Sequence, residues 1–241
     1  MDESDRFPYI CFMMVNSMYA VIVSGGSGKR MGAEIPKQFL LLNGLPVLAH
    51  TLKAFFDFNA EIELIVVLPP ESIETWKSLC KEYKITIPHT MVMGGAERFD
   101  SVQNGLNVIK SNSGLVAIHD GVRPLVSRET ITRCLDAAEL TGAAIPVLEL
   151  TDSLRFRSEH DSKAVNRKDY VTVQTPQCFS LEKIREAYKS PFNASFTDDA
   201  SVFEESGFPV ELVKGNPENI KITVPGDIEL AEFFIRRREN K

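Results

Sequence analysis

The glycine-rich segment at residues 24–32 is the part of the sequence best suited to binding an anion. It reads Ser-Gly-Gly-Ser-Gly-Lys-Arg-Met-Gly and follows a short apolar run. Glycine allows backbone N–H groups to approach an anion closely, and Lys29 and Arg30 add positive charge. The segment therefore predicts a phosphate-binding turn, although a tight turn between strand and helix without a ligand would use the same glycines.

Two well-known nucleotide-binding motifs do not fit this segment. A P-loop would need glycine where Val23 stands, and Ser or Thr where Arg30 stands. A dinucleotide-binding turn would need its third glycine at Met31. These mismatches exclude a standard P-loop and weaken the interpretation as a nicotinamide-dependent oxidoreductase.

Charged residues follow apolar runs at two further places. A proline precedes Lys37 and stiffens its loop, so this lysine can be aimed at a ligand. The run at residues 115–119 leads into Asp120, with Arg123 close behind. Asp120 is a candidate to hold Mg²⁺ or to accept a hydroxyl hydrogen bond, or else it caps the next turn. His119 points to the opposite side of its strand and is expected to be structural.

Weaker polar motifs follow other apolar runs. The pair Gly94-Gly95 stands before a stretch of helical pattern that contains Ser101, which suggests a second turn suited to an anion or a base. Further motifs surround Thr175, Thr197 and Lys221. The sequence has no G-x-S-x-G elbow, no H-E-x-x-H motif and no Cys/His nucleophile pair, which disfavours hydrolases.

Apolar runs alternate with amphipathic stretches from Tyr19 onwards, as in βαβ units on a mainly parallel sheet. Strands are expected at residues 20–24, 63–68, 90–93, 115–119, 143–148 and 210–213. Helices are expected at residues 46–58, 72–83, 98–110, 127–141, 180–189, 198–206 and about 225–238. Ser72 is expected to cap the second of these helices, and Gly207 to end the sixth in the left-handed conformation. Such a sheet brings polar groups together beyond the carboxyl ends of its strands.

The segment at residues 151–172 breaks this alternation. It is polar, has no helical stripe, and contains Arg155, Arg157, Arg167 and Lys168. It is expected to be either a flexible loop or a β-hairpin arm. An isolated two-stranded ribbon is marginal in water, so an ordered arm would need support, most naturally from a second subunit.

Composition places the chain among ordinary globular proteins. Of its 241 residues, 44% are hydrophobic and 25% are charged, which argues against disorder and coiled coils. The formal net charge of −6 disfavours nucleic-acid binding. The four cysteines form no C-x-x-C pair, which fits a reduced, cytoplasmic compartment. The apolar run at residues 7–15 is too short to cross a membrane, and residues 1–17 are expected to be a loose leader.

Seven motifs occur in an informative order. They are the glycine-rich loop ending in Lys-Arg-Met, then Pro-Lys-Gln, Gly-Gly-x-x-Arg-x-x-Ser, His-Asp-x-x-Arg-Pro, Thr-Pro-Gln, Thr-Asp-Asp-Ala-Ser and Asn-Ile-Lys-Ile-Thr. In this order the chain resembles the 2-C-methyl-D-erythritol 4-phosphate cytidylyltransferases of the non-mevalonate isoprenoid pathway. The resemblance implies an α/β, Rossmann-like three-layer nucleotidyltransferase fold with a mainly parallel sheet and a protruding β-arm. Residues 18–241 would form a single cytidylyltransferase domain, with the arm at about 151–172.

The resemblance also implies a reaction and the roles of individual residues in it. CTP and 2-C-methyl-D-erythritol 4-phosphate would react with Mg²⁺ present, giving 4-diphosphocytidyl-2-C-methyl-D-erythritol and pyrophosphate, in a homodimer whose arm reaches the neighbouring site. Arg30 and Lys37 would stabilise the charge at the α-phosphorus, and Arg167 and Lys221 would grip the acceptor phosphate. The residues implied to bind substrates are Ser24, Gly25, Gly26, Gly95, Ser101, Asp120, Arg123, Ser153 from the partner's arm, Thr175 and Thr197.

Two departures from the family pattern and two rival functions stay open. Ala96 replaces an acid often seen after the Gly-Gly pair, which leaves the cytosine and ribose contacts less certain, and Ser153 replaces a common threonine but keeps the hydroxyl. A ribitol 5-phosphate cytidylyltransferase would share most of the motifs. A CTP-sensing module without turnover would keep the glycine loop but have no use for Arg167 or Lys221.

Overall fold

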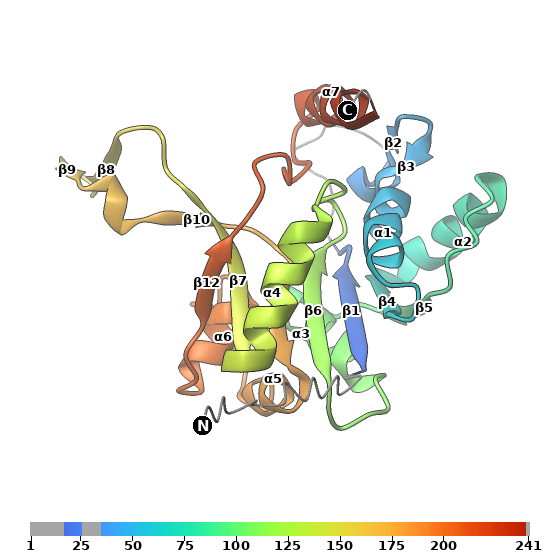
Figure 1. Cartoon of the computed structure of the whole chain (residues 1–241), viewed down its shortest axis with the longest axis horizontal. Coiled ribbons are helices and arrows are strands. Elements are labelled where there is room, and N and C mark those ends of the chain that lie inside the picture. Colours follow the sequence, from blue (N-terminus) through green and yellow to red (C-terminus); the bar gives the residue numbers. More distant parts are fainter. Residues whose placement is uncertain (1–16, 26–34, 240–241) are drawn as a thin grey trace, which may run out of the picture.

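Short apolar runs rich in β-branched residues form the parallel part of the central sheet. The computed structural model describes residues 17–25 and 35–239 of the chain, so the expected leader falls almost entirely outside the described residues. The parallel strands are β1, Met18–Val23; β4, Glu63–Leu68; β5, Thr90–Met93; and β6, Leu115–Asp120. β1 lies between β4 and β6, and β5 pairs with β4. All four are therefore aligned, with their carboxyl ends at one edge (Figure 1).

The other half of the sheet mixes directions. Its strands are β7, Ala143–Glu149; β10, Val171–Val173; β11, Gln177–Ser180; and β12, Glu211–Lys214. The order across the sheet is β10-β7-β11-β6-β1-β4-β5, and β12 pairs in parallel with β7. β11 runs antiparallel between β6 and β7. The sequence did not predict β10, which has only three residues, or β11, in which only two of the four residues are apolar.

Helices cover both faces of this sheet, so the expected three-layer α/β class is confirmed (Figure 1). On one face lie α1, Val47–Phe58; α2, Ile73–Glu82; and α4, Arg128–Thr141. On the other lie α3, Arg98–Asn107; α5, Leu181–Ala187; and α6, Asp199–Glu205. Strand alternation divides the core: Ile22 packs with the first group, and its neighbour Val21 packs with the second.

One of the two predicted helix caps is confirmed, and Ser127 caps a helix without having been predicted to do so. Ser127 accepts a hydrogen bond from the backbone N–H of Thr130 at the start of α4. Gly207 follows α6 with φ of 81°, as expected for a left-handed end. The expectation for Ser72 was wrong. Its backbone is already helical, in the 3₁₀ turn η3 at Pro70–Ser72, and its side chain makes no capping hydrogen bond.

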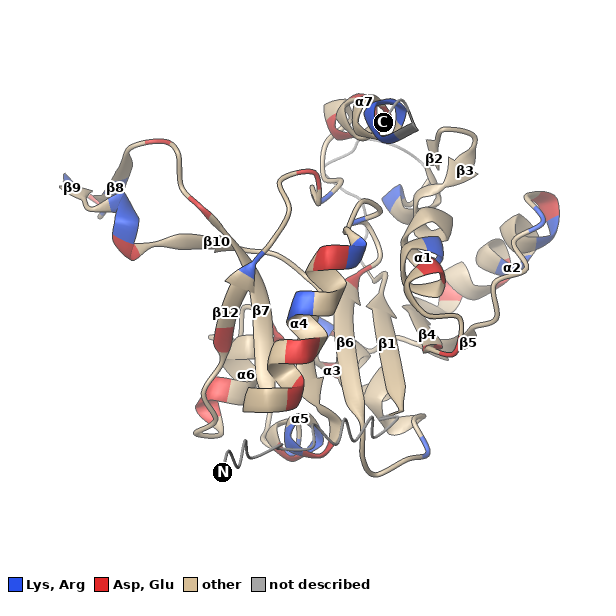
Figure 2. Cartoon of the chain, viewed as in Figure 1, with Lys and Arg blue, Asp and Glu red and all other residues tan. Residues whose placement is uncertain are grey.

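The segment at residues 151–172 contains an antiparallel hairpin of β8, Leu154–Arg157, and β9, Ser162–Val165. A 3₁₀ turn, η4 at Arg167–Asp169, follows it. Of the two alternatives left by the sequence, the structure adopts the arm, which projects away from the central sheet (Figure 1). Lys and Arg residues gather on it (Figure 2).

The remaining elements close the molecule near the carboxyl edge of the sheet. They are the 3₁₀ turn η2, Lys37–Phe39; the short pair β2, Leu41–Leu42, and β3, Leu45–Pro46; and α7, Gly226–Glu239. A small hydrophobic core, which includes Leu42, Val122 and Ile222, packs these elements together. Within the described ranges, no helix combines the length and apolarity needed to cross a bilayer.

Gly105 provides a test of how closely α3 must approach the sheet. A methyl group at this position would lie 2.5 Å from Cγ1 of Val21 and 3.0 Å from Cγ2 of Val67. Valine side chains on strands are stiff, so the helix would have to move. Although alanine is the better helix former, Gly105→Ala should lower the free energy of unfolding by about 1–3 kcal/mol, measured by urea denaturation.

Gly226→Ala is the matched control, because a methyl group at the first residue of α7 meets no atom within 4 Å. It should change the free energy of unfolding by less than about 0.5 kcal/mol. Equal stability of Gly105→Ala and the parent would show that α3 can shift outward without loss.

Candidate active site

A pocket of about 600 Å³ opens where the parallel strands end. Its walls come from the carboxyl ends of β1, β4, β5 and β6 and from the loops that follow them, as the topology requires. Seven of the residues predicted to bind or act on substrates line this one pocket: Ser24, Gly25, Lys37, Gly95, Ser101, Asp120 and Lys221. The fold therefore brings together residues from opposite ends of the described sequence.

The other predicted site residues lie elsewhere. Gly26 and Arg30 fall outside the described residues. Arg123 and Thr175 stand behind the pocket wall, where each contacts Asp120. Thr197 lines an adjoining pocket of about 400 Å³ between α3 and α6, which shares Glu97 and Arg98 with the first. Two more, Ser153 and Arg167, are exposed on the arm, where the Arg167 guanidinium donates to the carbonyl of Thr151.

Asp120 is the electrostatic centre of the pocket. One of its carboxylate oxygens lies 2.9 Å from Nζ of Lys221 and 3.4 Å from Nε of Arg123. Burial alone would raise the pKa of Asp120, but the charges of Lys221, Arg98 and Arg123 outweigh burial and lower the pKa below its usual value. Asp120 is therefore ionised, and it holds Lys221 at the pocket.

The backbone that carries Lys221 is fixed by buried hydrogen bonds. Arg123 donates from Nη1 to the carbonyl of Asn219 at 2.7 Å, and the Asn219 side chain donates to the carbonyl of Thr175 at 2.8 Å. The N–H of Ile222 donates to the carbonyl of Val122 at 2.9 Å. The loop before α7 is thus joined on both sides of Lys221 to the segments that follow β6 and β10.

Lys37 is positioned by the residues that follow it in η2. The buried Gln38 side chain donates from Nε2 to the carbonyl of Ser24 at 3.0 Å, which ties η2 to the end of β1. Phe39 stacks on Trp76 with ring centroids 5.9 Å apart. This packing explains why the Pro-Lys-Gln motif holds its lysine in the same pocket as Ser24 and Gly25.

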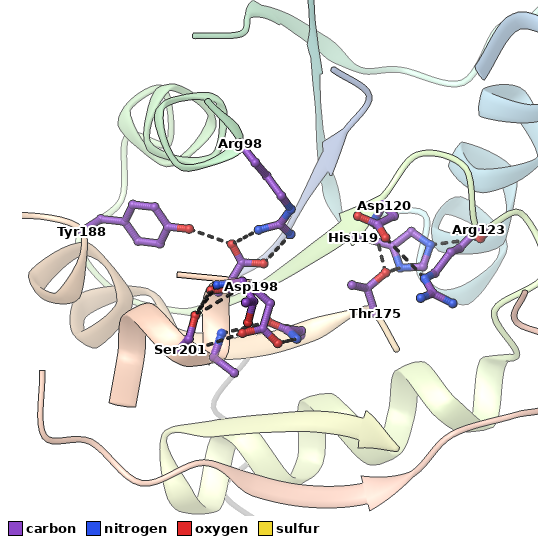
Figure 3. Close-up of polar contacts among 12 residues, drawn as sticks. Arg98, His119, Asp120, Arg123, Thr175, Tyr188, Asp198 and Ser201 are labelled. Atoms are coloured by element: carbon purple, nitrogen blue, oxygen red, sulfur yellow. Dashed lines mark hydrogen bonds and ion pairs between the residues drawn. The ribbon is translucent and has the colours of Figure 1, made fainter. Parts of the chain in front are cut away.

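His119 supports the pocket from behind, as the expected structural histidine. It is fully buried, and its Nε2 lies 3.0 Å from the carbonyl of Arg123, so Nε2 carries the proton (Figure 3). Its Nδ1 then accepts a hydrogen bond from the Thr175 hydroxyl at 3.1 Å, and the same hydroxyl accepts from the backbone N–H of Asp120. Thr175 therefore fixes the backbone at Asp120 rather than facing the pocket.

Sequence reasoning assigned no role to Arg98, although it lines the pocket at the start of α3. Its guanidinium makes a bidentate ion pair with Asp199. The only signal in the sequence was the position of Arg98 in the Gly-Gly-x-x-Arg-x-x-Ser motif. Its partner lies 101 positions later, which no local pattern could identify.

The buried state of His119 predicts a pH dependence of stability. Burial lowers its pKa to about 4, from an ordinary value of 6.5. The unfolded chain therefore binds a proton at a higher pH than the folded chain does. The contribution of His119 to the free energy of unfolding is complete above about pH 6.5, and should fall by up to about 3 kcal/mol as the pH approaches 4.

Urea unfolding at a series of pH values measures this contribution. His119→Gln keeps a donor and an acceptor but cannot titrate, so the pH dependence of its unfolding should be flatter than that of the parent between pH 6.5 and 4. Parallel curves for the two proteins would contradict the assignment.

Comparison with known proteins identifies the family. The sequence profile of 2-C-methyl-D-erythritol 4-phosphate cytidylyltransferase matches residues 18–237. The enzyme of that name from Porphyromonas gingivalis is 52% identical over 223 residues, which cover 92% of this chain and 99% of the relative. The one from Bacteroides thetaiotaomicron is 48% identical, covering 89% of this chain and 98% of the relative.

A solved structure agrees with these matches. The crystal structure of 2-C-methyl-D-erythritol 4-phosphate cytidylyltransferase from Thermus thermophilus superposes with a TM-score of 0.72 at 36% identity, covering 90% of this chain and 98% of that one. The profile match over most of the chain and the high identities agree on one family. They confirm the resemblance seen in the motifs. The chain belongs to the 2-C-methyl-D-erythritol 4-phosphate cytidylyltransferase family of nucleotidyltransferases.

Proposed function

We propose that this protein transfers CMP from CTP to 2-C-methyl-D-erythritol 4-phosphate, giving 4-diphosphocytidyl-2-C-methyl-D-erythritol and pyrophosphate in isoprenoid precursor biosynthesis. One observation carries the proposal at the level of the site. Lys37 and Lys221, which come from opposite ends of the sequence, line the same pocket as Ser24 and Gly25. A reaction between two phosphate-bearing substrates needs cations arranged in this way.

The chemistry requires alignment more than covalent participation by the protein. A phosphate oxygen of the acceptor attacks the α-phosphorus of CTP, a new P–O bond forms, and the bond to pyrophosphate breaks. Two anions must be brought together and relieved of their repulsion. Lys221 would bind the acceptor phosphate, and Lys37, together with Arg30, would stabilise the charge that develops at the α-phosphorus.

The nucleotide would lie against the ends of β1 and β5. Gly25, Gly95 and Ser101 line this part of the pocket. Within the described residues, the buried Ser24 hydroxyl and the Gln38 side-chain oxygen have no hydrogen-bond partner. Buried polar atoms are rarely left unpaired, so these two are suited to donors and acceptors on a ligand.

The pocket fits a magnesium ion that is held mainly by the substrate. Asp120 is an ionised carboxylate in the pocket, and no cluster of three or more potential metal ligands occurs in the described ranges. Mg²⁺ commonly uses one or two carboxylates together with substrate phosphates and water. Asp120 would hold the ion, which when bound neutralises phosphate charge.

We also propose that the enzyme is a cytoplasmic homodimer. Arg167 and Ser153 lie on an exposed arm that projects from the sheet (Figure 1). The arm is suited to complete the pocket of a second subunit, in which Arg167 would meet the acceptor phosphate and Ser153 would contact a substrate.

The decisive assay measures pyrophosphate release from CTP with methylerythritol phosphate, with ribitol 5-phosphate and without acceptor. We expect release with the first acceptor only. Preference for ribitol phosphate would replace the proposed substrate, and CTP binding without turnover of either acceptor would favour a sensing module.

Lys37→Ala tests the role of Lys37 in the transition state. Because this lysine should act on the charge that develops at the α-phosphorus, kcat should fall by about 10²-fold or more while the Kd for CTP changes only a few-fold. Steady-state kinetics and calorimetry measure the two quantities. Lys77→Ala, which removes an exposed lysine on α2, is the control. An unchanged kcat would remove Lys37 from the chemistry.

Mixing two inactive variants tests whether the arm acts in the partner's site. Arg167→Ala and Lys221→Ala should each impair use of the acceptor with CTP binding largely retained. If Arg167 acts across the dimer, a mixed dimer has one site with both residues intact. Equimolar mixing with subunit exchange should then restore about one quarter of the parental activity. If Arg167 acts within its own chain, mixing restores none.

A further inference from the structure

We propose that Arg98 is a positioning residue for CTP, acting through its ion pair with Asp199. The pair holds the first turn of α3, which forms one wall of the pocket, against α6. This inference rests on the proposed function, because it concerns the pocket assigned to the nucleotide. It also gives the Thr-Asp-Asp-Ala-Ser motif a role that does not require Thr197 to reach the substrate.

The geometry of the pair is that of a rigid clamp. Nη1 and Nη2 of Arg98 lie 2.8 and 2.6 Å from the two carboxylate oxygens of Asp199. The Asp199 side chain is fully buried, and the Tyr188 hydroxyl donates to it at 2.7 Å (Figure 3). Two parallel charge-assisted hydrogen bonds fix both the position and the orientation of a guanidinium.

Arg98 keeps its positive charge in this partly buried place. Burial opposes the charged form of Arg98, but the neighbouring Asp199 carboxylate outweighs burial and raises the pKa of Arg98. The charge of Arg98 in turn helps to lower the pKa of Asp120. Arg98 therefore contributes to the field of the pocket while Asp199 compensates its charge.

The position of Arg98 also fixes the start of α3, which forms the wall of the pocket where the nucleotide would bind. Arg98 is the first residue of the helix. The preceding Glu97 and the following Asp100 form a capping box, and Ser101 accepts a hydrogen bond from the backbone N–H of Gly95 at 3.1 Å. A displacement of Arg98 would therefore move Gly95 and Ser101, both of which line the pocket.

The other end of the clamp is fixed equally firmly. Asp198 and Ser201 form the capping box that begins α6. The Gln177 side chain on β11 donates to Asp198 at 2.7 Å and accepts from the backbone N–H of Ala200 at 2.9 Å. Asp199 thus stands on a helix start that is tied to the central sheet, which suits it to hold a long cationic side chain in place.

The experiment compares variants of the full-length protein by CTP calorimetry, steady-state kinetics and thermal unfolding. Arg98→Lys keeps the charge but cannot make the bidentate pair. Tyr188→Phe removes only the supporting hydrogen bond. The double variant Arg98→Met with Asp199→Leu replaces the pair by apolar side chains, which commonly restores stability. Lys53→Ala, which breaks an exposed ion pair of 2.7 Å on α1, is the control.

We expect Arg98→Lys to raise the Kd and KM for CTP by about 10-fold or more, with the KM for the acceptor changed less than about two-fold. Tyr188→Phe should give a smaller change in the same direction, and Lys53→Ala none. The double variant should recover most of the melting temperature that Arg98→Lys loses, apart from the cost of leaving the Tyr188 hydroxyl unpaired, but it should not recover the parental Kd for CTP. If the pair served stability alone, the melting temperature and the Kd for CTP would both return toward the parental values in the double variant.

Each outcome decides one question. Parental CTP affinity in the double variant, or in Arg98→Lys, overturns the role of Arg98 and leaves the proposed function intact. If Arg98→Lys does not fold, the Kd values of the double variant and of Tyr188→Phe still test the role of Arg98 in CTP binding. Should the parent itself fail to bind CTP in calorimetry, the proposed function and this inference are both wrong.

Discussion

The structure depends on one electrostatic constraint: cations must be held close together in a pocket before any anionic substrate arrives. Lys221, Arg123 and Arg98 all act on the same carboxylate, Asp120, and all three lower its pKa. Without that carboxylate they would repel one another in a partly buried place, where charges interact more strongly than in water. The rest of the fold keeps this arrangement fixed. The sheet brings the strand ends together, and buried polar side chains such as Asn219 hold the loops that carry the cations.

The parallel topology explains why this arrangement forms at one edge. β1, β4, β5 and β6 enter the pocket with their carboxyl ends, so every loop that follows them begins near the same point. The residues that begin these loops differ from strand to strand. Glycines follow β1 and β5 and allow close approach to the backbone, and β6 ends in Asp120 with Arg123 just after it. The loop with Lys221 follows β12, which has the same direction as these strands but pairs with β7 in the other half of the sheet, and Arg123 and Asn219 hold this loop in place.

Local patterns predicted the elements well and the pairing between distant elements poorly. The strands at residues 63–68 and 90–93 agree with the observed bounds, because mainly apolar runs between turn residues are distinctive. β11 was missed, since only two of its four residues, Cys178 and Phe179, are apolar, and its place depends on antiparallel pairing with β6 and β7. The gathering of Lys37, Asp120 and Lys221 was predictable from the strand ends and the motif order. The pairing of Arg98 with Asp199 was not, because both residues belonged to recognised motifs but neither motif indicates which residue lies opposite it.

The two ion pairs beside the pocket differ in a way that matches different tasks. Asp199 is fully buried, and its partner Arg98 is one-third exposed, so their separation would leave a carboxylate without water or partner. Asp120 is 12% exposed, and Lys221 is 42% exposed. A lysine this open can exchange its carboxylate for a phosphate oxygen at little desolvation cost, and Asp120 would then become available to a bound cation. Burial and two parallel hydrogen bonds suit the Arg98–Asp199 pair to stay closed, and the exposure of Lys221 suits its pair with Asp120 to exchange. A site built in this way keeps its walls rigid while its charged centre rearranges around the substrates.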